Sequence, residues 1–191
     1  MATDRGQIRR VLLAQSGDRE ALDGLLRDLQ GPLFGYLAGL VGDRHLAEDV
    51  LQDAFVLICR KLAWLREPEV FRPWAYRIAS REAFRRLRKE RRRGVRLVEG
   101  SIAEELAADE EPEAFEPEWL GRIPELIGSA SPASRAVLML HYLEGLSLDE
   151  VAAVLDLSPG TVKSRLSYGL AALRRKVGCE GPPPGRARSV P

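Results

Sequence analysis

The sequence predicts an all-α fold made of two small helical domains joined by an acidic flexible linker. Apolar residues recur at helical spacing through most of the first 93 residues and again after residue 123. Such spacing places them on one face of a helix. Residues 97–121 carry nine acidic and no basic side chains, a composition typical of an unpacked connection. The sequence contains no clear β-strand pattern.

The first domain is predicted to contain a series of amphipathic helices. A short helix covers residues 7–15, and Asp18 is a suitable N-cap for the next one. That second helix continues to residue 40, and Pro32 is expected to interrupt or kink it. Gly42-Asp43 is predicted to end it and to start a helix that runs roughly to residue 65. A turn at residues 66–69 and a helix over 71–93 complete this part.

The second domain is predicted to resume near Ile123. An apolar helix is expected over residues 134–143, followed by a break at 144–147. Two further helices are expected over 148–155 and 159–177, separated by a three-residue turn. The Gly/Pro-rich tail after Cys179 is expected to be disordered.

Charge is strongly segregated along the chain. The formal net charge is only +1, from 29 basic and 28 acidic residues, yet residues 72–96 carry 11 basic and 2 acidic side chains. A basic block of this density indicates a phosphate-bearing partner such as nucleic acid. The acidic block that follows it is expected to mask the basic surface in the free protein.

Several classes of protein are excluded by composition. No apolar run approaches the ~18–20 residues that span a bilayer, and the N-terminus lacks the apolar region of a secretory signal. The two cysteines have no CxxC partner, and the two histidines lie about a hundred residues apart, so they support neither a disulfide framework nor a metal site nor a catalytic triad. We therefore expect a cytoplasmic protein that is not an enzyme and needs no cofactor or metal.

Residues 147–166 are the most specific motif, a predicted helix-turn-helix. Ser158 is a suitable N-cap and Pro159 suits the first helical position. Asp156 stands in the turn, where Gly more often supplies a left-handed conformation. Four residues are expected to face the core: Val162, Leu166, Leu170 and Leu173. The side chains expected to reach a DNA major groove are Thr161, Lys163, Ser164, Arg165, Ser167 and Tyr168.

Residues 71–93 form a second candidate nucleic-acid surface. Three aromatic residues alternate with arginines in Phe71-Arg-Pro-Trp-Ala-Tyr-Arg77, and more arginines follow. Cations attract the phosphate backbone, and aromatic faces stack on unpaired bases. This combination suits a surface that holds separated DNA strands. Core packing is the alternative interpretation for Trp74 and Tyr76.

Together these segments resemble the extracytoplasmic-function (group IV) sigma factors of bacterial RNA polymerase. Residues 17–22 resemble the opening helix boundary of the family, and residues 43–55 resemble the polymerase-binding segment of sigma region 2. Residues 71–79 resemble the promoter-melting segment. Residues 142–147 followed by 160–166 are similar to the signature of sigma region 4.

The resemblance implies a division of the chain into four parts. These are a region 2 domain (residues 1–96), the acidic linker (97–121), a region 4 domain (122–178) and the tail (179–191). It also implies that the chain binds core RNA polymerase, through the clamp helices of the largest subunit and the flap of the second largest. Promoter DNA, both duplex and single-stranded, is the other partner. Many relatives are held inactive by an anti-sigma factor, which this sequence does not identify.

The resemblance further implies three sets of interface residues. Those expected to face polymerase are Glu48, Asp49, Gln52, Asp53 and Phe55. Those expected to bind and melt the −10 element are Trp64, Arg66, Phe71, Arg72, Trp74, Arg77, Arg81, Arg85 and Arg88. The −35 element is assigned to the outward residues of the helix-turn-helix.

Arg81 and Arg85 depart from the family pattern, since family members often carry Asn and Asp at these two positions. The change adds positive charge to the −10 helix, which strengthens phosphate binding. The alternative function is a helix-turn-helix regulator that acts without polymerase. That reading leaves the aromatic and basic helix unexplained.

Overall fold

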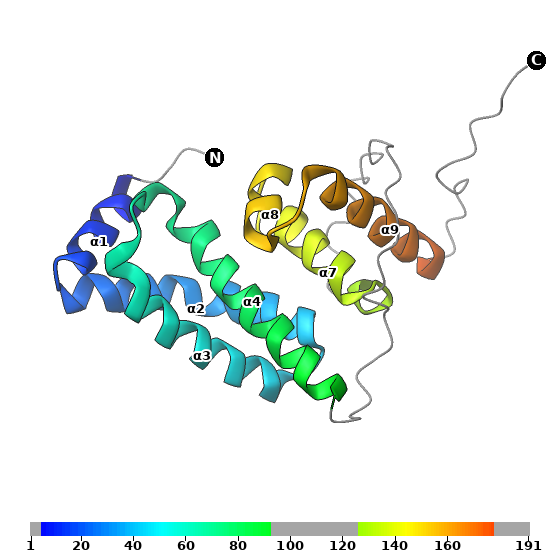
Figure 1. Cartoon of the computed structure of the whole chain (residues 1–191), viewed down its shortest axis with the longest axis horizontal. Helices are drawn as coiled ribbons and strands as arrows, with labels where there is room; N and C mark the ends of the chain where they lie inside the picture. The colour runs from blue at the N-terminus through cyan, green and yellow to red at the C-terminus, as the bar shows by residue number, and fades with distance from the viewer. Residues whose placement is uncertain (1–4, 93–125, 178–191) are drawn as a thin grey trace, which may run out of the picture. The chain divides into compact units, whose positions relative to one another are not determined.

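The computed structural model describes residues 5–92 and 126–177. Every regular element in these ranges is helical (Figure 1), which confirms the all-α prediction. The chain divides into two compact units. The first holds α1 to α4, and the second holds α7, η4, α9 and most of α8. The predicted linker, the restart near Ile123 and the predicted tail lie outside the described residues.

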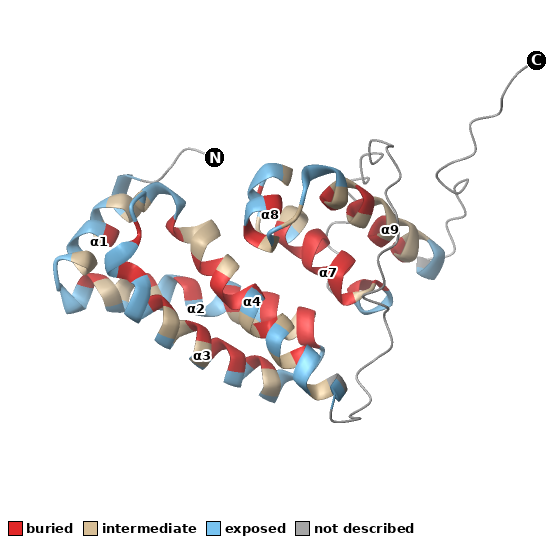
Figure 2. Ribbon diagram, in the orientation of Figure 1, coloured by how far each residue is buried: buried red, intermediate tan, exposed pale blue. Residues whose placement is uncertain are grey.

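In the first unit α2 contacts α1, α3 and α4, and α3 also contacts α4. Figure 2 shows buried residues alternating with exposed ones along α3 and α4, as expected for amphipathic helices. The elements are α1 (Arg5–Gln15), α2 (Arg19–Val41), α3 (Arg44–Lys61), the 3₁₀ turns η1 (Leu62–Trp64) and η2 (Pro68–Val70), and α4 (Phe71–Arg92).

Side-chain caps define the helix boundaries of this unit. The Asp18 carboxylate accepts a hydrogen bond from the backbone N–H of Ala21 at 3.0 Å, and Asp43 caps α3 in the same way. Gly42 ends α2 with a φ of 75°, a left-handed conformation that glycine adopts without steric cost. These three sequence predictions are confirmed. Of the two outcomes expected at Pro32, the interruption is wrong, because α2 continues through it with Leu29 and Leu33 buried on either side.

The third helix is shorter than predicted. It ends at Lys61, and the chain continues through η1 rather than as α-helix to residue 65. The Gln15 side chain of α1 donates hydrogen bonds to the backbone carbonyls of Leu62 (2.9 Å) and Leu65 (2.7 Å). This long-range contact satisfies the carbonyl groups that a helix end leaves free, so the chain can turn here.

The core of the first unit includes two tyrosines that make a polar contact. The rings of Tyr36 and Tyr76 meet edge to face, with their centroids 5.4 Å apart. The Tyr36 hydroxyl lies 2.7 Å from the hydroxyl of Ser80, and both residues are buried. Tyr76 is therefore a core residue, which decides between the two interpretations of this aromatic side chain.

The second unit begins with a buried arginine anchor. The Arg135 guanidinium donates to the backbone carbonyls of Ile127 and Ala130, each at 3.1 Å, and burial lowers its pKa. Its elements are η3 (Ile127–Ser129), α7 (Pro132–Leu138), the π-helix η4 (Met139–Leu143), α8 (Leu148–Leu155) and α9 (Pro159–Val177). The apolar helix expected over 134–143 thus comprises α7 and a π-helical continuation.

The helix-turn-helix has the predicted boundaries. Ser147 and Glu150 form a capping box at the start of α8, and Asp156 ends it at a φ of 59°. The Ser158 hydroxyl accepts from the backbone N–H of Thr161 at 3.1 Å and so caps α9. The helices α7 and α9 cross closely, since a Cβ added at Gly169 would lie 2.7 Å from a methyl carbon of Leu138.

Candidate nucleic-acid and partner interfaces

One face of α4 carries a row of cationic side chains. Arg77, Arg81, Arg85 and Arg88 follow one another at intervals of four, four and three residues, which places them on one side of the helix. Arg81, Arg85 and Arg88 are exposed, while Arg77 is half-buried. The opposite side of α4 is buried. We call these four arginines the α4 stripe.

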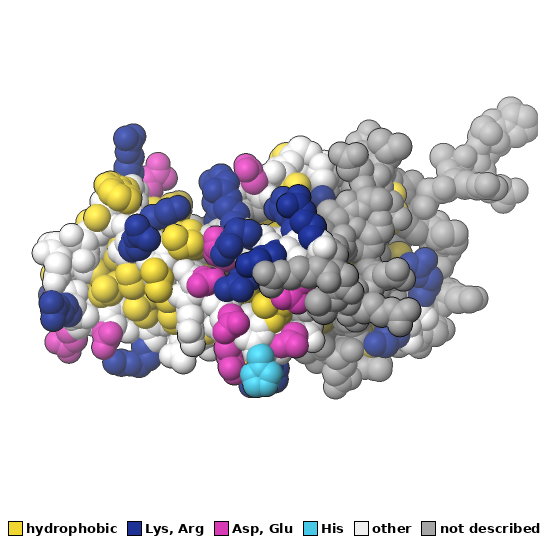
Figure 3. Space-filling view, turned by 60° about the horizontal axis from the view of Figure 1, so that its bottom comes forward, with side chains coloured by type: hydrophobic (Ala, Val, Ile, Leu, Met, Phe, Trp, Pro, Cys, Tyr) yellow, Lys and Arg dark blue, Asp and Glu magenta, His cyan; other side chains and the backbone are white. Residues whose placement is uncertain are grey.

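An aromatic ring lies beside this stripe. Trp74 is half-buried and lines a cleft of about 330 Å³ together with Lys61, Arg77 and Arg81. A cationic cleft with an aromatic wall offers both phosphate attraction and a stacking surface. Figure 3 shows basic and acidic side chains next to one another on one face of the molecule, close to exposed hydrophobic side chains.

The aromatic residues predicted to stack on bases fall into two groups. Trp64 has 77% of its surface exposed, and Arg66 near it is also exposed. Phe71 is only 2% exposed, so its assignment to the −10 surface is wrong. It lies one helical turn before the buried Ala75 and belongs to the same packed side of α4. Arg72 lies over the ring of Tyr76 at 5.8 Å and is half-buried.

The residues predicted to bind polymerase lie along α3. Glu48, Asp49 and Gln52 are exposed, and Phe55 is half-buried. Glu48, Gln52 and Phe55 line a cleft of about 700 Å³ between α2 and α3. Arg44 lies over the Phe34 ring at 5.0 Å and lines the same cleft. The arrangement offers carboxylates beside partly exposed apolar surface, a mixture that suits a protein partner.

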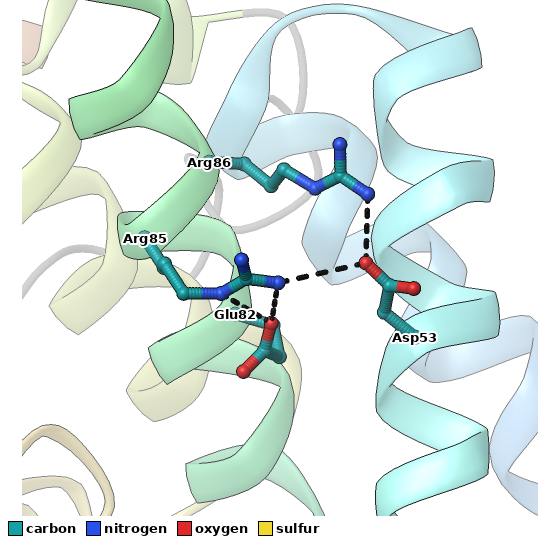
Figure 4. Close-up of polar contacts among 4 residues, drawn as sticks. All are labelled: Asp53, Glu82, Arg85 and Arg86. Carbon is teal, nitrogen blue, oxygen red and sulfur yellow. Dashed lines mark hydrogen bonds and ion pairs between the residues drawn. The ribbon is translucent and has the colours of Figure 1, made fainter.

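Asp53 does not share this arrangement. Its carboxylate accepts a hydrogen bond from Arg86 at 2.7 Å and lies 3.7 Å from Arg85, both on α4 (Figure 4). Arg85 also donates through Nε to Glu82 at 2.7 Å. Asp53 therefore joins α3 to α4, a contact that the sequence prediction did not include, while 41% of its side chain stays exposed. The hydrogen bond to Asp53 raises the pKa of Arg86.

Glu82 and Arg86 are site residues that the sequence reasoning missed. The pair Glu82 and Arg85 stands at a helical i,i+3 spacing and could have been recognised from the sequence. The pairing of Asp53 with Arg86 could not, since 33 residues separate them. Two carboxylates and two guanidiniums meet here, so the charge that Arg85 adds to α4 is balanced locally.

The predicted −35 residues are less exposed than those of α4. Thr161, Lys163, Arg165, Ser167 and Tyr168 are half-buried, and burial lowers the pKa of Arg165. Ser164 is 3% exposed, so the prediction that its hydroxyl faces DNA is wrong. Helical spacing locates the side of a helix that is opposite its apolar stripe, but it does not show what else packs around that helix. The four predicted core residues, Val162, Leu166, Leu170 and Leu173, are all buried.

Other kinds of site have no counterpart in the described parts of the chain. No group of three or more His, Cys, Asp or Glu side chains is placed to hold a metal ion within residues 5–92 and 126–177. In the same ranges, no helix combines the length and the apolar character needed to cross a membrane.

Comparison with known proteins assigns both units. A family model described as sigma-70 region 2 matches residues 25–93, and one described as sigma-70, region 4 matches residues 120–173. The ECF RNA polymerase sigma-E factor of Escherichia coli (strain K12) is 31% identical over 191 residues, covering 92% of this chain and 94% of that protein. A probable RNA polymerase sigma factor, RfaY of Xanthomonas campestris pv. campestris, is 29% identical over 86% of this chain, which spans 42% of that protein.

A solved structure shows the same fold. The sigma factor RpoE from Bartonella quintana, crystallised with the anti-sigma factor NepR, aligns with a TM-score of 0.62 at 20% identity, covering 85% of this chain and 98% of that one. A region 2 unit and a region 4 unit in one chain define a sigma factor of bacterial RNA polymerase. The chain belongs to the extracytoplasmic-function sigma factors, and its function is that of an RNA polymerase sigma factor.

Proposed function

We propose that the two units divide promoter recognition between them. The α4 stripe, with Trp74 and the exposed Trp64, binds and melts the −10 element, and α9 binds the −35 element as duplex. The observation that carries the proposal is the α4 stripe, whose three exposed arginines follow one face of a helix beside an aromatic cleft. Phosphate attraction along such a row, with stacking at one end, suits a strand that is being separated.

Binding to core polymerase is assigned to α3. Glu48, Asp49, Gln52 and Phe55 contact the clamp helices of the largest polymerase subunit, and the second unit contacts the flap of the second largest. Exposed carboxylates beside a wide cleft support this assignment. Asp53 is left out, since its carboxylate is engaged by α4.

The assignment predicts that Asp49→Lys abolishes association with core polymerase in gel filtration. Asp49 is exposed and lies at the surface of α3, so the helix content measured by circular dichroism should not change. Glu20→Lys on α2, at an exposed position, is a matched control for a change in charge within the same unit. Undiminished association of Asp49→Lys would reject α3 as the polymerase-binding surface.

The −35 contacts are assigned to the N-terminal half of α9. Lys163 and Arg165 supply the charge, and Thr161, Ser167 and Tyr168 supply polar contacts. A recognition helix that follows a tight turn and carries short polar side chains near its start fits a major groove. In this proposal the region 2 domain ends at residue 96, the linker at residue 121 and the region 4 domain at residue 178.

An anti-sigma factor is a further proposed partner. The Bartonella quintana sigma factor of similar fold was crystallised with one. We also propose that the chain acts in the cytoplasm beside RNA polymerase and performs no catalysis of its own. A helix-turn-helix regulator that acts alone is the function to exclude.

Run-off transcription from a promoter library, with and without core polymerase, tests the scheme. The expected result is selective transcription in the presence of the chain, with base preferences in both the −10 and −35 elements. Selection that depends on −35 alone would reject the role of α4. Sequence-specific duplex binding that needs no polymerase would favour the alternative regulator.

A further inference from the structure

The guanidinium of Arg85 is held in place from two sides. Its Nε and Nη2 groups both contact the Glu82 carboxylate, and Nη2 also lies 3.7 Å from Asp53 (Figure 4). Asp53 is in turn fixed by Arg86 at 2.7 Å. The Glu82 side chain is 15% exposed, Arg86 27% and Asp53 41%, so Glu82 is the part of this support that is best shielded from water. Arg85 itself has 57% of its side chain exposed.

This support distinguishes Arg85 from its neighbour on the stripe. Arg88 has no carboxylate within ion-pair distance in the described part of the chain, and its Nε donates only to the backbone carbonyl of Phe84 at 3.3 Å. A cation that serves only to attract phosphate gains nothing from a carboxylate partner, because pairing reduces its local charge. Two carboxylates beside Arg85 therefore point to another use of this side chain.

A fixed guanidinium is suited to reading a base. Its planar shape can donate two parallel hydrogen bonds, and holding it in advance removes part of the entropy cost of binding. Glu82 uses Nε and one hydrogen of Nη2, while Asp53 at 3.7 Å is too far for a hydrogen bond. The end of the guanidinium that is formed by Nη1 and the second hydrogen of Nη2 points away from Glu82 (Figure 4), and it provides the two parallel donors. Guanine presents two acceptors, O6 and N7, on one edge, the pattern that a guanidinium matches best.

We propose that Arg85, positioned by Glu82 and Asp53, reads the O6 and N7 edge of one guanine in the −10 element. This inference rests on the proposed role of α4 in −10 binding. Arg85 is the base-contacting residue, whereas Glu82 and Asp53 are positioning residues that act through it. Arg81 and Arg88, one turn away on either side, bind phosphate.

The test uses holoenzyme assembled from the full-length chain and core polymerase, on a library randomised through the −10 element. Wild type prefers guanine at one position by roughly 5- to 150-fold, the range for one good bidentate contact. Arg85→Lys keeps the positive charge but cannot donate two parallel hydrogen bonds. This variant loses the preference for guanine, while base preferences at the other promoter positions are unchanged. Arg19→Lys, an exposed arginine on α2, is the matched control and keeps the wild-type profile.

A change in the DNA gives the same test without altering the protein. Replacing the selected guanine by 7-deazaguanine removes the N7 acceptor, and wild-type holoenzyme loses several-fold in affinity for that promoter. Arg85→Lys, which no longer uses N7, shows no further loss.

Glu82→Gln separates positioning from simple structural support. It removes a negative charge beside the stripe, so binding to non-specific DNA should become tighter while the guanine preference weakens. If Glu82 only stabilised the fold, Glu82→Gln would lower both the affinity for non-specific DNA and the guanine preference. The inference is overturned if Arg85→Lys keeps the wild-type preference, or if no guanine position depends on Arg85. A wild-type holoenzyme without any −10 selection would instead reject the role of α4 itself.

Discussion

The helices α4 and α9 both carry basic side chains toward promoter DNA in our proposal, but they expose them differently. On α4 the buried residues and the arginines lie on opposite sides, and Arg81, Arg85 and Arg88 are exposed. On α9 Lys163 and Arg165 are half-buried and Ser164 is 3% exposed. The first helix packs on one side, whereas the second is enclosed on more of its circumference.

This difference separates two ways of binding DNA. An exposed row of arginines contributes a large electrostatic attraction that depends strongly on salt and little on sequence. Half-buried polar side chains at the start of a helix contribute little attraction, but their positions are restricted, which favours base recognition. We therefore expect substitutions of Arg81 and Arg88 on α4 to change overall affinity, whereas substitutions on α9, like that of Arg85, change selectivity or, at buried positions, folding.

The largest expected effect is on DNA affinity. Arg81→Ala with Arg88→Ala should weaken binding of holoenzyme to a −10 single strand by roughly 100-fold at low salt, because two phosphate contacts are lost. Each lost contact should also reduce the slope of log affinity against log salt concentration by about 0.7. Arg5→Ala with Arg19→Ala, both exposed in the same unit, is the control with equal charge change. Fluorescence anisotropy across a salt series measures both quantities, and an unchanged slope would contradict the phosphate role.

The second effect is on stability. Ser164→Lys places a long cationic side chain at a position that is 3% exposed, and it should lower the free energy of unfolding by roughly 1–3 kcal/mol. Lys163→Ala, at the neighbouring half-buried position, should change stability by less than about 0.5 kcal/mol. Urea denaturation of both variants measures this contrast. Equal unfolding free energies for Ser164→Lys and Lys163→Ala would contradict the burial of Ser164.

A smaller effect is expected at the join between α3 and α4. Asp53→Asn weakens the charged hydrogen bond to Arg86, and the loss should be about 1 kcal/mol because both side chains are partly exposed. Asp23→Asn removes a fully surface pair with Arg27, where both side chains are 75% exposed, and should cost almost nothing. Thermal unfolding distinguishes the two, and similar Tm values would show that the Asp53 contact contributes no stability.

An effect of similar size is expected at the turn between α8 and α9. Asp156 has a φ of 59°, a conformation that β-branched residues adopt poorly. Asp156→Val should therefore lower the unfolding free energy by roughly 1 kcal/mol, whereas Asp156→Gly should not. Calorimetry of both variants checks the order, and a Val variant as stable as the Gly variant would show that the turn relaxes.

Local chemistry explains the features that the sequence predicted well. Asp18, Asp43 and Ser158 cap helices because a short polar side chain reaches the backbone N–H groups three residues later. The buried residues of α9 follow from a strict spacing of leucines and one valine. These relations involve residues within one or two turns, so a linear pattern contains them.

Contacts between distant segments explain where the predictions were wrong. The end of α3 depends on Gln15, which lies far earlier in the chain, and the orientation of Asp53 depends on Arg86 on another helix. Phe71 and Ser164 are buried by what surrounds them rather than by their own helix. The sequence by itself determined the helices, their caps and the family, because these depend on local spacing and motif order. Only the tertiary structure decided which charged and aromatic side chains remain available to a partner, because burial and ion pairing depend on neighbours that are distant in the chain.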